Sequence, residues 1–170
     1  AIEGNFDVIF VAHKYFMPLL ERKGLNCFWL PRAYDSLYIK KYDEIEAISD
    51  ISFCGQTGIH KSICEFPLLD EEIGIHYHTG AYKNCSIAER FLGFENTSFE
   101  YADRAEILMR LSKDFDIRIY EETHEVNYAK TICRGKITVN RSLWFDAALR
   151  NFEVMACNRF LITDELPYQE

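Results

Sequence analysis

The stretch from Lys136 to Asp164 constrains the fold more than any other part of the chain. The apolar run Ile137–Val139 predicts a short buried strand, and Phe160–Thr163 predicts another. A strand, a helix and a second strand in this order predict an α/β fold with a Rossmann-like parallel sheet and flanking helices. The helix between the strands is indicated by apolar residues at helical spacing, which give it one apolar face: Leu149, Phe152, Met155 and Ala156.

Two charged residues share another face of this predicted helix. Arg150 and Glu153 lie three positions apart, in the first turns. N–H groups at a helix N-terminus favour phosphate, and a carboxylate can accept hydrogen bonds from two neighbouring hydroxyls. The pair therefore indicates a ligand with phosphate groups and a sugar diol, whereas the alternative is a surface ion pair that contributes about 0.2–0.5 kcal/mol. Asn158 is predicted to end the helix, because Asn tolerates the left-handed conformation.

The segment Leu149-Arg-Asn-Phe-Glu-Val-Met-Ala-Cys-Asn-Arg-Phe-Leu-Ile-Thr-Asp164 resembles the signature of group 1 glycosyltransferases. It is most similar to the CgeB-like (spore maturation protein type) branch, which carries Arg-x-Phe-Glu-x-Met-Ala-Cys-Gly before a strand that ends in Thr-Asp. The resemblance implies a GT-B architecture, in which two Rossmann-like halves bind a sugar nucleotide between them. It also implies that Glu153 holds the ribose hydroxyls and that Arg150 lies near the diphosphate.

Two positions depart from the family pattern. Asn158 stands where the family has Gly after the Cys, and Phe145 stands where the wider superfamily has the first Glu of a Glu-x7-Glu pair. Asp146, next to Phe145, is therefore a candidate for contact with the donor sugar or the phosphates. The pattern identifies no catalytic acid or base and does not distinguish retention from inversion of the anomeric centre.

The N-terminal part predicts a further strand, helix and strand. Asp7–Ala12 is expected to be a buried strand, a helix follows from about Lys14 to Gly24, and Cys27–Leu30 is a second strand parallel to the first. The run Trp29-Leu-Pro-Arg-Ala-Tyr-Asp35 resembles the last unit of the N-terminal half in CgeB-like proteins. His13 follows the first strand and is a candidate contact for donor or acceptor, with a structural histidine as the alternative.

This resemblance divides the chain into two domains. Residues 1–35 are expected to be the last strand-helix-strand unit of the N-terminal Rossmann half with its linker, and residues 36–170 the C-terminal nucleotide-sugar-binding Rossmann domain, truncated. The run Asp50–Gly55 looks like the first strand of that domain. Gly55 at its end is a candidate neighbour of phosphate or acceptor, because glycine permits close backbone approach; a simple turn is the alternative.

Residues 56–101 are interpreted as an insertion, since they are longer than an ordinary connection between strand and helix. Cys64, His76, His78 and Cys85 lie within it. These residue types can bind zinc, but their spacing matches no structural zinc pattern, so a surface element that recognises the acceptor or covers the site is preferred. No cofactor and no metal are expected.

The chain from 101 to 141 predicts a helix, a strand, a second helix and the Lys136 strand. Tyr120 ends the strand Asp116–Tyr120 and could stack on a nucleobase, with an interior tyrosine as the alternative. Gly135 is expected to cap the second helix, which spans about 124–134. Asn140 and Arg141 follow the Lys136 strand and are candidates for the binding rim, with a solvated arginine as the alternative for Arg141.

Composition excludes several classes of protein. With 170 residues, 48% of them hydrophobic, the chain can build a substantial core, and a net charge of −8 argues against binding to a nucleic-acid backbone. No apolar run approaches the roughly 20 residues that cross a bilayer, and no leader is visible. The six cysteines show no Cys-x-x-Cys spacing and are expected to be reduced thiols of a cytoplasmic protein.

The sequence therefore predicts a glycosyltransferase that moves a hexose from a nucleoside diphosphate sugar to an acceptor hydroxyl. Its expected partners are the sugar nucleotide and an acceptor whose nature the residues do not identify. Two alternatives remain. One is a non-catalytic nucleotide-sugar-binding protein, and the other is a flavodoxin-like module that binds another protein through its aromatic insertion.

Overall fold

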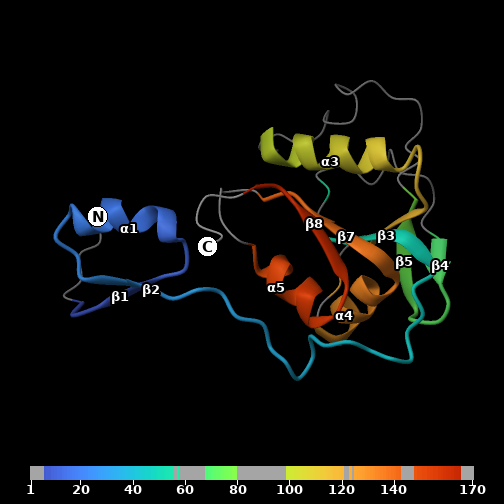
Figure 1. The fold of residues 1–170 in the computed structure, drawn as a ribbon, viewed down its shortest axis with the longest axis horizontal. Helices are drawn as coiled ribbons and strands as arrows, with labels where there is room; N and C mark the ends of the chain where they lie inside the picture. The colour runs from blue at the N-terminus through green and yellow to red at the C-terminus, as the bar shows by residue number, and fades with distance from the viewer. Residues whose placement is uncertain are drawn as a thin grey trace.

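The computed structural model describes residues 6–55, 57, 68–79, 99–120, 123, 125–142 and 148–165. Within these residues the strands form two sheets, one of two strands near the N-terminus and one of six strands. The larger sheet is mostly parallel and is flanked by helices, so the predicted α/β class is confirmed (Figure 1). Asp146 and most of residues 56–101 lie outside the described residues.

The N-terminal unit contains β1 (Ile9–Val11), the 3-10 turn η1 (Lys14–Phe16), α1 (Met17–Glu21) and β2 (Cys27–Trp29). The two strands are parallel, as predicted, and pair Phe10 with Phe28. Gly24 has φ +76° and ends the helix, since its N–H donates to Glu21 O at 2.8 Å. The prediction that the strand Asp7–Ala12 is buried is wrong, because Phe10 is 65% exposed and Val8 is 39% exposed.

Four parallel strands form the centre of the larger sheet. They are β3 (Ser49–Cys54), β6 (Ile117–Tyr120), β7 (Gly135–Asn140) and β8 (Phe160–Thr163), and they lie side by side in the order β6-β3-β7-β8. Each of them coincides with an apolar run that predicts a strand. The β-branched and aromatic composition of those runs suits a sheet that is covered on both faces.

Two further strands extend this sheet on the β6 side. They are β4 (Leu68–Asp70) and β5 (Ile75–His78), an antiparallel hairpin whose second strand also pairs antiparallel with β6. The hairpin lies within the predicted insertion, so part of that segment belongs to the sheet. His76 and His78 are alternate residues of β5, and the described residues contain no cluster of three side chains suited to a metal ion.

Helices cover both faces of the larger sheet (Figure 1). On one face α3 (Phe99–Leu111) packs Leu108 against Ile51, Phe53 and other residues of the central strands. On the other face lie α4 (Glu125–Cys133) and α5 (Leu149–Ala156), which form a second buried cluster. None of the helices among the described residues is long and apolar enough to cross a bilayer.

The α5 helix differs in part from its prediction. The side chains of Asn151 and Val154 are buried, whereas Met155, expected on the apolar face, is 57% exposed. The predicted ending is confirmed: Asn158 has φ 53°, and the N–H groups of Asn158 and Arg159 donate to Met155 O and Val154 O at 3.0 and 3.2 Å. These two bonds satisfy carbonyls that the helix leaves unpaired.

Two other predictions about buried elements are corrected. The strand β8 is not fully buried, because it ends the order of the described strands and exposes Phe160 (68%) and Ile162 (49%) on one side. Gly135 does not cap α4 but begins β7. A Cβ at this position would overlap the backbone N of Ser52, so the close approach of β7 to β3 requires glycine.

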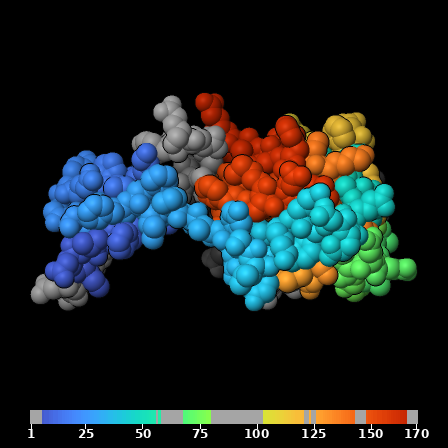
Figure 2. All heavy atoms as spheres, turned by 60° about the horizontal axis from the view of Figure 1, so that its bottom comes forward, coloured from blue at the N-terminus to red at the C-terminus, as the bar shows by residue number. Residues whose placement is uncertain are grey.

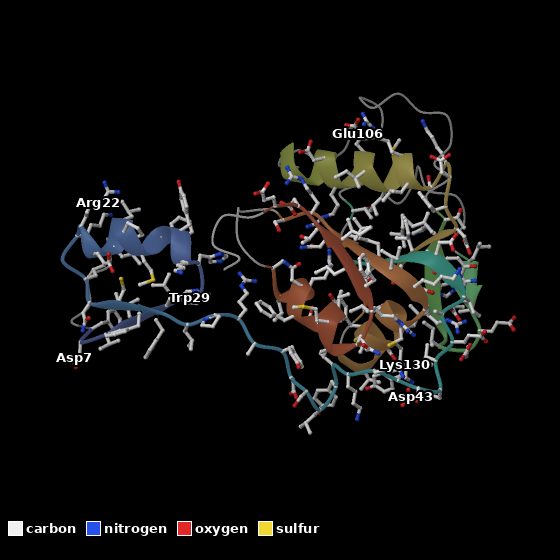
Figure 3. The ribbon with its side chains drawn as sticks, in the orientation of Figure 1. Asp7, Arg22, Trp29, Asp43, Glu106 and Lys130 are labelled. Atoms are coloured by element: carbon white, nitrogen blue, oxygen red, sulfur yellow. The ribbon has the colours of Figure 1, made fainter. Side chains whose placement is uncertain are left out.

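The segment from residue 36 to residue 48 joins the two sheets and lies on the surface of the molecule beside α4 and α5 (Figure 2). It inserts Ile39 and Ile45 into the cluster formed by α4 and α5. Lys130 of α4 lies 5.9 Å from the centre of the Tyr42 ring, close to Asp43 (Figure 3). These contacts attach the segment to the same helices that carry the candidate site.

Candidate functional site

The order of the parallel strands defines where a ligand is expected. From β3 the chain passes to β6 on one side and then to β7 and β8 on the other, so the strand order reverses between β3 and β7. Open α/β sheets bind ligands outside the carboxyl ends of the strands at such a reversal. Cys54 and Asn140 are the last residues of these two strands, and Gly55 follows Cys54.

Arg150 bridges the two strand ends. Its Nη2 donates to Cys54 O at 2.5 Å, its Nη1 donates to Asn140 Oδ1 at 3.3 Å, and its Nε donates to the Tyr128 hydroxyl at 3.4 Å. The guanidinium also lies over the Phe53 ring, 4.6 Å from its centre. The first turn of α5 thus places a fixed cation at the reversal point of the sheet.

Gly55 adopts a backbone conformation that makes room for this cation. Its φ is +135°, and its N–H donates to Tyr120 O at 2.9 Å. A Cβ at position 55 would overlap the Nη2 atom of Arg150. The structure therefore explains this glycine by the approach of Arg150, in addition to the conformational freedom that the left-handed region requires.

Glu153 lies one turn further along α5 and is half-buried. Burial raises the pKa of its carboxyl, while the hydroxyl of Tyr128 and the charge of Arg150 act in the opposite direction. Burial also raises the pKa of the Tyr128 hydroxyl, which keeps this group protonated at neutral pH. Tyr128 on α4 therefore adjoins both charged residues of the predicted pair.

Asn140 is buried and its amide is occupied on both sides. Its Nδ2 donates to Asn151 Oδ1 at 2.8 Å, and its Oδ1 accepts from Arg150. The residue lies in the predicted site, but its polar atoms hold other protein groups. Its described side-chain contacts are therefore with Asn151 and Arg150.

Arg141 points away from this group of residues. Its Nη1 donates to Asp164 Oδ2 at 2.8 Å and its Nη2 donates to Asp103 Oδ2 at 3.3 Å. The other carboxylate oxygen of Asp164 accepts from the backbone N–H of Ser142 at 2.9 Å. Arg141 thus joins β7, β8 and α3 by ion pairs, and its charge is balanced by two carboxylates.

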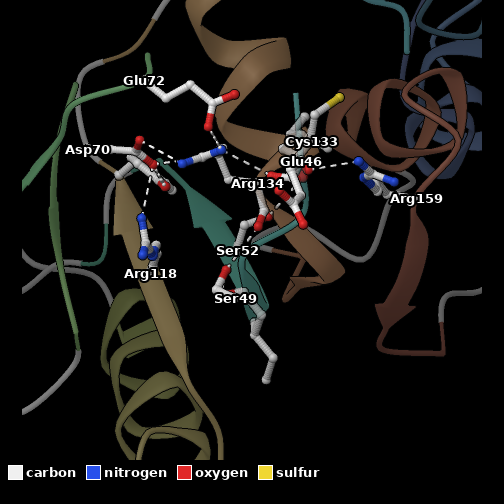
Figure 4. Close-up of polar contacts among 12 residues, drawn as sticks. Glu46, Ser49, Ser52, Asp70, Glu72, Arg118, Cys133, Arg134 and Arg159 are labelled. Atoms are coloured by element: carbon white, nitrogen blue, oxygen red, sulfur yellow. Dashed lines mark hydrogen bonds and ion pairs between the residues drawn. The ribbon is translucent and has the colours of Figure 1, made fainter. Parts of the chain in front are cut away.

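The expectation that Tyr120 stacks on a base is wrong, and the interior alternative holds. Tyr120 is fully buried and its hydroxyl donates to Asp70 Oδ2 at 2.9 Å. Asp70 also accepts from Arg134 at 2.8 and 2.9 Å and from Arg118 at 3.0 Å, and Arg134 contacts Glu72 (Figure 4). The pKa of the Tyr120 hydroxyl is raised by burial and by Asp70.

The remaining candidates lie elsewhere. His13 belongs to the N-terminal unit, where its Nε2 lies 2.9 Å from Arg32 Nη2 and its ring meets the Phe16 ring edge-on. Asp146 lies outside the described residues. The structure therefore brings together four of the predicted residues at the reversal point: Gly55, Asn140, Arg150 and Glu153.

Tyr128 and Phe53 are members of this group that sequence reasoning missed. Phe53 lies in a strand that is apolar throughout, where nothing distinguishes a residue that supports a guanidinium from one that fills the core. Tyr128 follows the helical pattern of α4 between buried positions, and a tyrosine there is equally suited to packing. Only the approach of Arg150 from α5 to Tyr128 on α4 and to Phe53 on β3 gives these side chains their role.

The arrangement suits an anionic ligand with hydroxyl groups. The three acceptors of Arg150 are neutral oxygens, so its positive charge remains available to phosphate oxygens. A carboxylate on the same helix face can accept hydrogen bonds from a diol. No cluster of three side chains suited to a metal ion includes Glu153 among the residues that the structure describes.

Comparison with known proteins agrees with this chemistry. Residues 90–170, which include α3 to β8 and hence Arg150 and Glu153, match a family described as glycosyl transferase-like. Neither a curated protein nor a solved structure matches the chain significantly. The family match covers a little less than half of the chain, and it supports a glycosyltransferase-type domain in that part.

Proposed function

We propose that this chain contains the nucleotide-sugar-binding part of a CgeB-like glycosyltransferase, located in the cytoplasm. In this proposal Arg150 contacts the diphosphate of a nucleoside diphosphate sugar and Glu153 accepts hydrogen bonds from the ribose hydroxyls. The sugar, a hexose, is transferred to an acceptor hydroxyl. The leaving diphosphate is stabilised by the Arg150 charge and by the N–H groups at the start of α5.

The proposal rests on the position of Arg150 at the carboxyl ends of the parallel strands. The guanidinium of Arg150 is fixed across the carboxyl ends of β3 and β7 by three neutral acceptors, with Glu153 on the next turn of the same helix. This is the place where open α/β sheets bind nucleotides. The match of residues 90–170 to a glycosyl transferase-like family supports the same assignment.

Calorimetric titration with UDP, GDP, dTDP and ADP tests this proposal. We expect one of these diphosphates to bind, and we expect Glu153→Gln to weaken its binding at least tenfold, because the neutral amide is a poorer acceptor for two hydroxyls. Glu106→Gln is the matched control, because Glu106 lies on α3 (Figure 3) and pairs with Arg110 at the surface. A folded wild-type protein that binds none of the four nucleotides contradicts the proposal.

A second function is favoured by one position of the sequence. Phe145 replaces the first carboxylate of the superfamily's pair. This replacement favours a protein that binds a nucleotide sugar without transferring it. Mass spectrometry of reactions with a nucleoside diphosphate sugar and a panel of hydroxyl acceptors separates the two functions, since release of the nucleoside diphosphate coupled to glycosylation of an acceptor occurs only in the enzyme.

A further inference from the structure

Arginine side chains in this protein are held in two different ways. Arg134 and Arg141 each contact two carboxylates. By contrast, the ion pairs among the described residues do not include Arg150, and its three hydrogen bonds end on a backbone carbonyl, an amide and a hydroxyl. Three neutral groups therefore fix the position of the Arg150 guanidinium without neutralising its charge.

The amide of Asn140 is the central member of this arrangement. It is 2% exposed and receives support from Asn151, which is 6% exposed, through a bond of 2.8 Å. An aspartate has the same shape and would accept from Arg150 more strongly, because charge-assisted hydrogen bonds are about twice as strong as neutral ones. If the only role of residue 140 were to hold Arg150, aspartate would form the stronger hydrogen bond.

Apart from Glu153, the other described neighbours of the guanidinium are also neutral. Tyr128 is half-buried and the thiol of Cys54 is buried, and burial raises the pKa of both groups. Among the described residues Glu153 is the charged neighbour that interacts with this guanidinium, and it is the residue assigned to the sugar. The hydrogen-bond acceptors of Arg150 therefore leave its charge available at the carboxyl ends of β3 and β7.

We propose that Asn140 is a positioning residue that holds the Arg150 guanidinium across β3 and β7 without adding a carboxylate to it, so that the site selects a diphosphate over an uncharged nucleoside. The inference rests on the proposed function, which it deepens by naming the group that sets the charge of the site. Asn140 acts through Arg150 and does not itself contact the ligand.

The substitution Asn140→Asp separates this role from a structural one. The aspartate keeps the shape of the residue and its bond to Arg150, and the amide of Asn151 can turn to donate to it. We expect Asn140→Asp to weaken the binding of the preferred nucleoside diphosphate at least tenfold, to leave the affinity for the matching nucleoside unchanged within a factor of two, and to leave the melting temperature unchanged or higher. A merely structural role predicts unchanged affinity for the diphosphate.

A second variant and a control complete the design. Tyr128→Phe removes one neutral acceptor of Arg150 without adding a charge, and we expect it to weaken diphosphate binding a few-fold; unchanged binding overturns the proposal even where Asn140→Asp does not fold. Asn127→Asp is the matched control, because Asn127 is exposed on α4 and receives the same change of charge. Its diphosphate affinity is expected to match that of the wild type.

Inorganic pyrophosphate, titrated in parallel, distinguishes the failure of this inference from the failure of the proposed function. If the protein binds a nucleotide and Asn140→Asp leaves that affinity unchanged, the inference is overturned and the proposed function stands. If the protein binds pyrophosphate but no nucleotide, and Asn140→Asp weakens pyrophosphate binding, the inference is supported and the proposed function is contradicted. A wild-type protein that binds neither probe refutes both.

Discussion

The substitution Asp70→Asn gives the sharpest test of how this fold is held together. Asp70 is 3% exposed and accepts four hydrogen bonds, two from Arg134 at 2.8 and 2.9 Å, one from Arg118 at 3.0 Å and one from Tyr120 at 2.9 Å. The asparagine has nearly the same shape, so the change removes the charge and turns one acceptor into a donor that faces other donors. The hairpin of β4 and β5 then loses this charged side-chain attachment to Arg118 and Arg134, while β5 keeps its backbone pairing with β6.

The size of the effect follows from burial. Removing one partner of a buried ion pair costs about 3–5 kcal/mol, because the remaining charge is left without compensation. Arg134 keeps its contact with Glu72, whose side chain is 44% exposed, so the lower end of that range applies. About 3 kcal/mol corresponds to a fall in melting temperature of roughly 6–12 °C for a chain of this length.

Urea unfolding followed by circular dichroism measures this loss. The control is Asp43→Asn, which removes a similar ion pair, with Lys41, in which the aspartate side chain is 82% exposed. Such surface pairs contribute about 0–1 kcal/mol. A loss for Asp70→Asn no larger than that of the control would refute the view that the buried network secures the hairpin, and nucleotide binding is expected to be the same in both variants.

The pH dependence of the same variant adds an independent check. Burial raises the pKa of Asp70, but the hydrogen bonds from Arg134 and Tyr120 and the nearby positive charges outweigh burial, so the pKa of the folded protein lies below the ordinary value. Stabilisation by a carboxyl with a lowered pKa is present above the unfolded value, about 3.9, and is lost as pH falls through the folded value. The difference between the wild type and Asp70→Asn is therefore expected to narrow below about pH 4.

Three further substitutions test other parts of the site and its helix. Glu153→Gln is expected to raise the melting temperature at pH 8 and to have little effect at pH 4. Burial raises the pKa of the Glu153 carboxyl, so the wild type loses stability relative to the variant as pH rises through that pKa. An equal change of melting temperature at both pH values contradicts this reasoning. Gly55→Ala is expected to lower the free energy of unfolding in urea by about 1–3 kcal/mol, since φ at this residue is +135°. It is also expected to weaken diphosphate binding, because the new Cβ displaces Arg150. A variant that binds the diphosphate as tightly as the wild type would show that the guanidinium is not held there. Asn158→Ala is expected to cost about 1–2 kcal/mol, because alanine avoids the φ of 53°, and a stability equal to the wild type would argue against the left-handed ending of α5.

Local sequence patterns predicted the parts of the fold that depend on local chemistry. The runs that became β3, β6, β7 and β8 each predicted a strand, and those of β3, β6 and β7 are apolar enough to be buried in the sheet. Asn158 could be predicted as the end of α5, since the preference for the left-handed conformation is a property of the residue itself. The pair Arg150 and Glu153 was found through its spacing and through the family resemblance.

The errors concern contacts between residues distant in sequence. Tyr120 lies in the interior, where Asp70, 50 residues earlier, accepts a hydrogen bond from its hydroxyl. No local sequence pattern predicts that the hairpin of β4 and β5 brings Asp70 there. The exposure of Phe160 depends on β8 ending the order of the described strands, which an apolar run cannot reveal. Likewise Asn140 was expected at the binding rim, but its position opposite Asn151 and Arg150 became visible only with the helix in place.

The distribution of charge explains why Arg150 is a better candidate for ligand binding than Arg134 or Arg141. Burying a charged group is costly unless it is paired, and Arg134, which is 3% exposed, is accordingly paired with Asp70 and Glu72. Arg141 is likewise balanced by carboxylates, Asp103 and Asp164. Arg150 also connects two strand ends, yet with neutral acceptors, an arrangement that is less stabilising than an ion pair for the protein alone. The Arg150 charge becomes fully paired when an anion binds to the guanidinium, as a nucleoside diphosphate would.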